Sequence, residues 1–434
     1  MSRALVQFVR SELGTSLSAS TGRGFNIVLS LASGIILARW LGPDGRGQFA
    51  VAASITVIGV QCVTLGFPAS IAYFGSVHPG SLRALLLRAQ GVVAAASILF
   101  AIVVLGIRVV FQPQWCGTID GPLFGAALVN VLASSALLVT QGACLAANEV
   151  WRYGWSDAVA RLLTVIALAI LAFIDTVGPL SALVCCVAAT SVTLVWLIKA
   201  MSPRIIGDEG GVPALGSELR YGFRSALACA LGTIPVRVIT IAVAARDGDA
   251  EGGQFAVALS VAETIVILGG TFAATRMCRM VEARHDPLGL RRELLRTLGA
   301  VGAGAIVCGV ALGAIAHPVF RLAFGERFIP AAGLLVDCLP GAVCLATASV
   351  FQWTLAARGL PIMALAAPAV SALVTWVLLA ASNASSATNI GSVYSLQGVA
   401  FLVASAIALA WNLRTMPNDP GGPMVASTNS RIAP

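Results

Sequence analysis

The sequence predicts an all-α integral membrane protein, with 12 transmembrane helices in two six-helix bundles related by a pseudo-two-fold axis along the membrane normal. Composition, the length of the apolar segments and an internal repeat together predict this fold. Of the 434 residues, 58% are hydrophobic and 11% are charged, whereas an ordinary soluble domain carries about 25% charge. The apolar residues form runs of roughly twenty, the length that a helix needs to cross a bilayer. Alternating stretches typical of transmembrane strands do not dominate.

Twelve apolar ranges are predicted to span the membrane. They are 24–41, 47–73, 90–110, 121–147, 158–175, 178–199, 222–245, 254–275, 296–316, 329–357, 361–382 and 391–412. The fifth and sixth ranges are separated only by "DTVG", and the tenth and eleventh only by "RGLP". Both separators contain turn-forming residues, so each is kept as a break.

The segment before the first range, residues 1–23, is predicted to be cytoplasmic. It lacks the continuous apolar core and the cleavage site of a secretory signal. Its first residues are compatible with a short amphipathic helix on the membrane surface and equally with a frayed end.

Basic residues set the predicted orientation. The chain has 26 arginines and a single lysine, and a cytoplasmic N-terminus places 20 of these 27 residues in or beside cytoplasmic segments. Positive charge is enriched on the cytoplasmic side of membrane proteins, so both termini are predicted to be cytoplasmic. The net charge of +8 follows from the same bias, and topology accounts for it better than nucleic-acid binding does.

Residues that usually carry enzyme chemistry are scarce, so neither an enzyme nor a cofactor or metal site is predicted. With one lysine the chain has no GxxxxGK phosphate-binding loop, and with three histidines it has no HExxH motif. The ten cysteines lie mostly within apolar ranges and show no metal-binding or disulfide pattern. The "DGD" of residues 247–249 resembles the metal-binding acids of some glycosyltransferases, but its short loop is more typical of a solvated turn.

The hexapeptide "GQFAVA" occurs twice, at Gly47 and at Gly253, within two 14-residue stretches that share eight positions. Other matches follow in the same order at almost the same spacing. "GFNIVLSLASGIILAR" aligns with "GFRSALACALGTIPVR" at an offset of 198, and "LLRAQGVV", "LVNVL" and "CLAAN" have counterparts at offsets of 207 to 210. Ordered matches of this kind predict a duplicated unit.

Each copy of the unit contains six predicted spans, so both copies begin and end on the same side of the membrane. Such parallel repeats enclose a central cleft in transporters that work by alternating access. The predicted organisation is an N-terminal bundle over 24–199, a cytoplasmic linker over 200–221, a C-terminal bundle over 222–412 and a disordered cytoplasmic tail over 413–434.

Charged residues inside the predicted spans are the candidate site residues, because a charge in hydrocarbon is costly and normally faces a cavity or a partner. Arg39 and Arg237 align in the repeat, so they predict a cationic site shared by both halves and suited to phosphate. Alternatively, Arg39 snorkels to the outer interface, since it lies just before "LGPDG". Glu263 is expected near Arg237, either as a structural ion-pair partner or as the carrier of a coupling proton or sodium ion.

Three further residues are weaker candidates for the cavity. Asp337 in the tenth range aligns with Asn130, and Arg161 lies at the start of the fifth range. The aligned residues Arg88 and Arg296 lie at inner span ends, where topology alone predicts positive charge.

Several segments resemble one family of transporters. "GIILARWLGPDGRGQFAVAASI" is similar to the signature of the first two spans of bacterial polysaccharide repeat-unit (O-antigen or exopolysaccharide) flippases. "CLAANEVWRYGWSDAVARL", "RLAFGERFIPAAGLL" and "LAARGLPIMAL" are further matches. The resemblance covers nearly the whole chain, and its motifs are structural ones that identify no substrate. This family belongs to the multidrug/oligosaccharidyl-lipid/polysaccharide exporter superfamily.

The resemblance implies a flippase for surface polysaccharide biosynthesis in the bacterial inner membrane. Its substrate would be an undecaprenyl-diphosphate-linked oligosaccharide, turned from the cytoplasmic to the periplasmic leaflet at the expense of an ion gradient. The implied partners are this lipid-linked oligosaccharide, membrane lipids, a coupling proton or sodium ion, and the polysaccharide polymerase and glycosyltransferases of the same pathway. The family's cationic cleft is lined by the first, second, seventh and eighth spans, on which Arg39, Arg237 and Glu263 fall.

Two other functions stay open at the level of sequence. One is a multidrug exporter of the same superfamily, which usually needs acidic and aromatic residues for cationic substrates. The other is a membrane-embedded glycan polymerase or transferase, which would need an essential catalytic residue in an outside loop.

Overall fold

The computed structural model describes residues 3–111, 119–202, 214–276, 279–280, 286–358, 361–381 and 388–414. Over these ranges the chain is helical and contains no strand, which confirms the predicted all-α class. Ten of the described helices are long and apolar enough to cross a membrane. The predicted tail over 413–434 lies almost entirely outside the described residues.

The helices follow one another along the chain with short connections. In the first half they are α1 (Arg3–Val63), α2 (Phe67–Val77), η1 (Pro79–Ser81), α3 (Leu82–Phe111), α4 (Gly121–Ala146), α5 (Val150–Phe173) and α6 (Pro179–Met201). In the second half they are α7 (Leu215–Asp247), α8 (Asp249–Thr275), α10 (Pro287–Val319), η5 (Phe320–Phe324), η6 (Glu326–Phe328), α11 (Ile329–Ala357), α12 (Pro361–Ala381) and α13 (Thr388–Arg414).

Every predicted range falls on an apolar helix. The first range and most of the second lie on Gly24–Val63, one apolar helical stretch that contains a kink, and most of the eleventh lies on the shorter apolar helix Leu365–Ala381. Several helices begin before the predicted range, as α3 does at Leu82 and α10 at Pro287, because their N-terminal segments carry arginines, which interrupt the apolar run. The breaks at "DTVG" and "RGLP" are confirmed by the ends of α5 and α11.

The second predicted range, 47–73, is interrupted in the structure, because α1 ends and α2 begins within it. Leu65 and Gly66, between these helices, have positive φ angles of 48° and 75°. That conformation ends a right-handed helix. Pro68 lies in the first turn of α2, where the fixed φ of proline is favourable.

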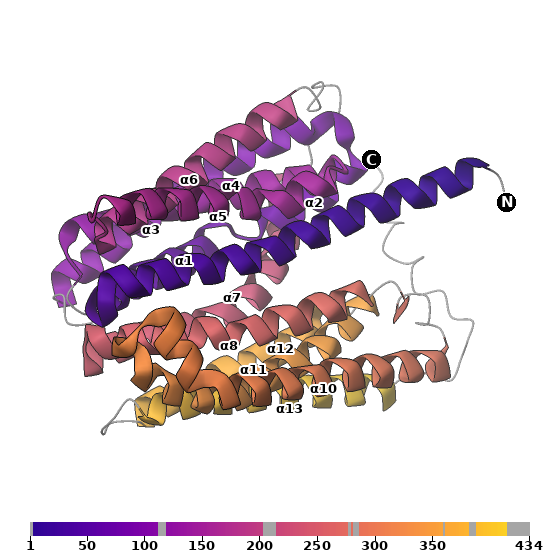
Figure 1. Cartoon of the computed structure of the whole chain (residues 1–434). Coiled ribbons are helices and arrows are strands. Elements are labelled where there is room, and N and C mark those ends of the chain that lie inside the picture. The colour runs from indigo at the N-terminus through magenta and orange to yellow at the C-terminus, as the bar shows by residue number, and fades with distance from the viewer. Residues whose placement is uncertain are drawn as a thin grey trace.

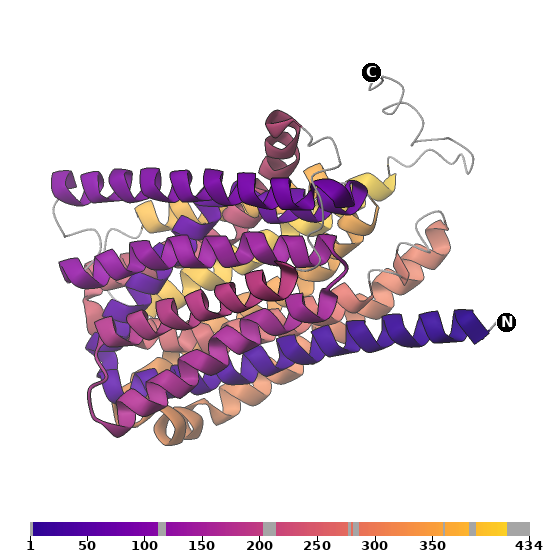
Figure 2. The same ribbon diagram turned by 90° about the horizontal axis from the view of Figure 1, so that it is seen from above.

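Two glycines at equivalent positions of the repeat make the same turn. Gly42 divides α1 with φ 66° and ψ −176°, and Gly248 separates α7 from α8 with φ 99° and ψ 166°. Residues with a Cβ rarely adopt such a φ, so both positions favour glycine strongly. Figure 2 shows the chain turning back after the first part of α1. These turns define the Gly42 end of the molecule, and α1 begins at the opposite, N-terminal end.

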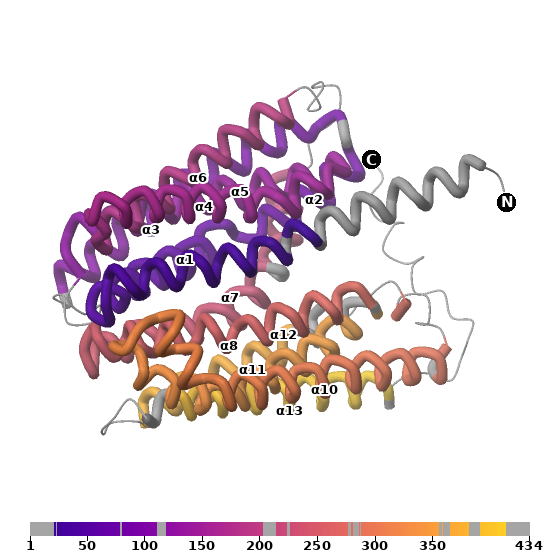
Figure 3. Tube along the Cα trace, viewed as in Figure 1, coloured from indigo at the N-terminus to yellow at the C-terminus, as the bar shows by residue number. Residues whose placement is uncertain are grey.

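The two halves of the chain occupy different parts of the molecule. Figure 1 shows α2 to α6 in the upper part and α8 and α10 to α13 in the lower part, with α1 and α7 between them. The tube in Figure 3 follows the same path. α1 packs against α5 of the first half and against α8 of the second half. Its residues are therefore well placed to contribute to a site between the halves.

The two "GQFAVA" segments contact each other at the Gly42 end. A Cβ on Gly47 would lie 1.8 Å from the Asp249 carbonyl oxygen, and a Cβ on Gly253 would lie 2.0 Å from the Pro43 carbonyl oxygen. These contacts are reciprocal, since both aligned pairs are separated by 206 residues. Gln48 also donates from Nε2 to Oδ2 of Asp249 at 3.3 Å. The second part of α1 and the start of α8 are therefore in backbone contact, which larger residues would prevent.

A second contact joins the halves near the N-terminal end. Glu218 in the first turn of α7 is buried and forms an ion pair with Arg88 of α3. Tyr221 of α7 stacks on Tyr73 of α2, with ring centroids 4.7 Å apart. Arg88, which topology alone would explain, thus also holds α7 against the first half.

Candidate functional site

A cavity of about 400 Å³ lies between the two halves of the chain. Its walls come from α1, α5 and α6 of the first half and from α8 and η5 of the second half. On α1, Asn26, Ser30 and Ser33 line the cavity at the spacing of one helical face. The polar lining residues of α8 are Ser260, Glu263, Thr264 and Thr271. A protein with an apolar composition therefore encloses a polar cavity.

Arg46 lines the cavity close to the Gly42 kink. The residue is only 8% exposed, and its guanidinium carbon is 5.4 Å from the centre of the Phe49 ring. The Nε atom has no hydrogen-bond partner. Within the described part of the chain, Arg46 forms no ion pair. A buried guanidinium without an anionic partner is costly, so this part of the cavity favours an anion.

Arg161 of α5 and Cys186 of α6 line the same cavity. The charges of Arg161 and Arg46 are close enough to interact, and Cys186 is near both guanidiniums. Two neighbouring cations raise the attraction for a ligand that carries more than one negative charge. Their forked donors match phosphate oxygens in particular.

Asp157 lines the cavity one helical turn before Arg161 on α5. Its Oδ1 accepts a hydrogen bond from Nε2 of Gln141 at 2.7 Å, and the same Nε2 donates to Oγ of Ser156 at 2.8 Å. Gln141 is buried within α4. The Asp157 carboxylate is therefore exposed to the cavity but held in one orientation.

Arg237 and Glu263, which the sequence places near each other, form an ion pair. Nη2 of Arg237 donates to Oε1 of Glu263 at 3.0 Å and to Oε2 at 3.2 Å. Glu263 lines the cavity, whereas Arg237 is not among the lining residues. The charge of Glu263 is thus balanced by Arg237. The role of Glu263 as the carrier of a coupling ion stays a prediction.

Arg39 lies outside the cavity lining. It is exposed, its Nε donates to the Ala323 carbonyl oxygen at 2.7 Å, and its Nη2 donates to the Leu322 carbonyl oxygen. Both carbonyls belong to η5, the π-helical turn that follows α10. Carbonyls at a helix end lack partners in the helix and favour a cation. The structure therefore does not bring Arg39 and Arg237 into one cavity.

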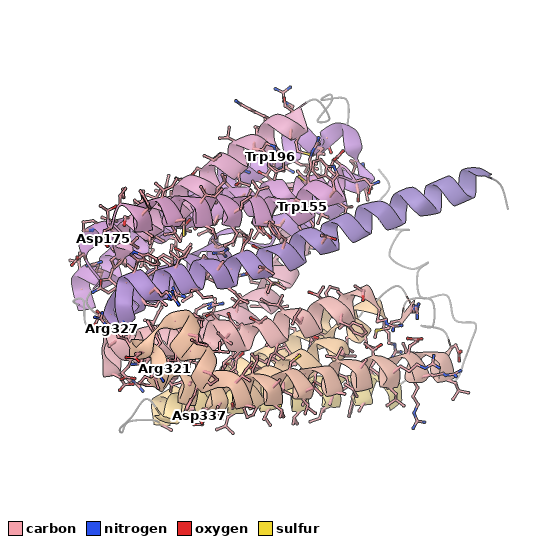
Figure 4. All side chains as sticks on the ribbon, in the orientation of Figure 1. Trp155, Asp175, Trp196, Arg321, Arg327 and Asp337 are labelled. Atoms are coloured by element: carbon pink, nitrogen blue, oxygen red, sulfur yellow. The ribbon has the colours of Figure 1, made fainter. Side chains whose placement is uncertain are left out.

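Asn130 and Asp337 also lie away from the cavity lining. Asn130 is buried in α4 and accepts a hydrogen bond from Oγ of Ser134 at 3.3 Å. Asp337 is exposed on α11, and Figure 4 places it at the lower margin of the molecule. The shared position of these two residues in the repeat has not given them a shared environment.

Sequence reasoning missed Arg46 and Asp157, which both line the cavity. Arg46 falls between the first two predicted spans, and Asp157 falls just before the fifth, so neither counted as a charge inside a span. One signal was available for Arg46, because the aligned position in the second "GQFAVA" stretch is Gly252. The arginine directly before the first "GQFAVA" is therefore not required by the repeated scaffold.

The Arg237 and Glu263 ion pair provides a direct prediction about stability. Arg237→Ala and Glu263→Gln should each destabilise the purified protein, and the double variant should lose less than the sum. Both side chains are about a quarter exposed (27% and 26%), so we expect a coupling of about 0.5–3 kcal/mol in a double-mutant cycle. Equilibrium unfolding in detergent measures it.

The exposed pair Arg321 and Glu326 is a matched control for this cycle. Its side chains are 66% and 74% exposed, at a distance of 3.1 Å. Solvent screens such a pair, so little coupling is expected there. Additive effects at Arg237 and Glu263 would contradict an energetically coupled pair.

The fold is similar to those of solved transporter structures. A multidrug resistance MATE family transporter of the MOP superfamily, in an inward-facing conformation, matches with a TM-score of 0.71 and 13% identity, covering 90% of this chain and 94% of that chain. The lipid II flippase MurJ, in an inward closed conformation, matches with a TM-score of 0.65 and 12% identity, covering 92% and 88%. A MOP superfamily transporter from Pyrococcus furiosus matches with a TM-score of 0.52 and 13% identity, covering 92% and 95%.

No protein-family model matches the chain, and no curated protein matches it either. At these identities, the structural likeness concerns the fold. The chain therefore has the fold of MOP superfamily transporters and flippases. Together with its ten described apolar helices, this fold supports a multi-pass membrane protein.

Proposed function

We propose that this protein is a flippase that moves an undecaprenyl-diphosphate-linked oligosaccharide from the cytoplasmic to the periplasmic leaflet of the bacterial inner membrane. The observation that carries the proposal is Arg46, a buried cation that lines the cavity between the halves and has no ion-pair partner in the described part of the chain. A diphosphate would supply that partner. The proposal assigns the diphosphate to Arg46 and Arg161, in place of Arg39 and Arg237.

The rest of the cavity supports a glycan beside the diphosphate. Its hydroxyl and amide side chains, such as Asn26, Ser30 and Thr271, offer donors and acceptors that match sugar hydroxyls. The similar fold of the lipid II flippase MurJ supports a lipid-linked substrate. Surface polysaccharide biosynthesis is the pathway that uses such a substrate, and its polymerase and glycosyltransferases are the proposed pathway partners.

We also infer that the chain forms two parallel six-span bundles that alternate around this cavity. The matching turns at Gly42 and Gly248 support this organisation, as do the reciprocal contacts of Gly47 and Gly253. The distribution of basic residues assigns both termini to the cytoplasm. In that orientation the Gly42 end faces the periplasm, and the glycine contacts close the cavity on that side.

An ion gradient is the proposed source of energy, with Glu263 as the carrier of the coupling proton or sodium ion. Glu263 lines the cavity, and its partner Arg237 comes from the neighbouring helix α7. Binding of a cation to the carboxylate would weaken this ion pair. The gradient would thereby act on the contact between α7 and α8, the helix that lines the cavity from the second half.

Reconstitution tests the proposed function. The full chain, placed in liposomes with a fluorescent undecaprenyl-diphosphate-linked oligosaccharide, should expose the oligosaccharide of the inner leaflet to a membrane-impermeant quencher. Protein-free liposomes and a monophosphate-linked glycan are the controls, and both should give slower exposure. Binding of a cationic dye without transport of the lipid would instead indicate a multidrug exporter. Lengthening of the glycan would indicate a polymerase.

A further inference from the structure

The charged groups of the cavity do not all have partners. Arg46 and Arg161 have no ion-pair partner among the described residues, and Glu263 is paired with Arg237. Asp157 contacts the neutral Gln141 and forms no ion pair in the described ranges. Two guanidiniums match a diphosphate, so no cation among the described lining residues is left for a second anionic group.

Asp157 and Arg161 lie on the same face of α5, separated by about 6 Å along the helix axis. α5 runs from the N-terminal end toward the Gly42 end, so Asp157 lies nearer the N-terminal end. Asn26 of α1 and Thr271 of α8 line the cavity toward the same end. A ligand whose diphosphate binds Arg161 therefore places its adjoining group beside a carboxylate, an amide and a hydroxyl.

We infer that the sugars next to the diphosphate are uncharged and that Asp157 is the residue that excludes acidic sugars. The inference rests on the proposed function, because it concerns the same cavity. With Oδ1 held by Gln141, Oδ2 of Asp157 is available to accept a hydrogen bond from a sugar hydroxyl. A sugar carboxylate in the same place would bring two like charges together, and such repulsion is how a binding site rejects a close analogue.

Two lipid-linked disaccharides that differ at one group test this inference. Both carry undecaprenyl diphosphate, and the sugar attached to the diphosphate is glucose in one and glucuronate in the other. The wild-type chain in liposomes should bind and transport the glucose compound better by about tenfold or more. Asp157→Asn should reduce the preference to about twofold, chiefly by improving the glucuronate compound. Asn keeps an acceptor for Gln141, so the variant is expected to fold.

Asp337→Asn is the matched control, because Asp337 is an exposed acidic residue outside the cavity lining. It should leave the preference of the wild-type chain unchanged. Equal handling of the two compounds by the wild-type chain would overturn the inference while the proposed function stands. An unchanged preference in Asp157→Asn would overturn the role of Asp157. If neither compound binds, the proposed function fails and the inference fails with it.

Discussion

Arg46→Ala is expected to weaken binding of a diphosphate lipid strongly without lowering the stability of the ligand-free protein. The guanidinium is buried and lacks an ion-pair partner in the described part of the chain, so its removal relieves a desolvation cost. With the ligand bound, the same change removes a buried charge pair, and affinity should fall by at least about 30-fold. Thermal unfolding with and without undecaprenyl diphosphate measures both quantities.

Two variants make the test of Arg46 specific. Arg46→Lys keeps the positive charge but loses the paired N–H donors of the guanidinium. Its affinity for undecaprenyl diphosphate should therefore lie between those of the wild type and Arg46→Ala. Arg321→Ala removes an arginine that is 66% exposed, and Figure 4 shows it toward the Gly42 end. This control should change neither affinity nor stability. A lower melting temperature with unchanged affinity in Arg46→Ala would show that Arg46 is a structural residue.

The fold could be predicted from the sequence because its signals are local and repeated. Each predicted range needed only a continuous apolar run, and each of them falls on an apolar helix. The glycines that open the hairpins, Gly42 and Gly248, stand at aligned positions and have similar dihedral angles. The interruption at Leu65 and Gly66 was missed, since an apolar run does not reveal a change in φ.

The cavity could be predicted only in part because its lining depends on which face each helix turns inward. Glu263 and Arg161 line it, but Arg39, which is aligned with Arg237, bonds to carbonyls of η5 instead. A π-helical turn after α10 has no signature in the aligned halves, so the sequence did not reveal that its carbonyl oxygens would accept hydrogen bonds from Arg39. Burial of Arg46 likewise depends on how α1 packs beside Arg161 of α5 and Cys186 of α6, which is a tertiary property.

Gly47→Ala is expected to open the Gly42 end of the molecule. The added Cβ would lie 1.8 Å from the Asp249 carbonyl oxygen, and that oxygen belongs to the backbone of α8, so a rotamer change cannot relieve the clash. The conformation in which α1 and α8 touch should therefore lose about 1–3 kcal/mol relative to one in which they separate. That difference changes the ratio of the two conformations by roughly 5–150-fold.

Spin labels at Asp44 and Asp247 measure this opening, since both residues are exposed near the glycine contacts. They would be introduced in a chain whose ten cysteines have been replaced. The population of longer distances should rise in Gly47→Ala, and transport should fall. Gly304→Ala is the control, because a Cβ there meets nothing within 4 Å, and it should leave the distances unchanged.

Reciprocity makes the prediction stricter, because Gly253→Ala creates the mirror clash with the Pro43 carbonyl oxygen at 2.0 Å. The two contacts lie side by side between the same two helices, so one separation relieves both clashes. Each single variant should therefore shift the distances by a similar amount, and the double variant should add less than the sum of the two. If only one variant shifts the distances, the two contacts are not equivalent, and the proposal that both glycines hold α1 against α8 is wrong. If neither variant shifts the distances, the backbone at the Gly42 end adjusts locally to the added Cβ, and the two glycines contribute only to packing.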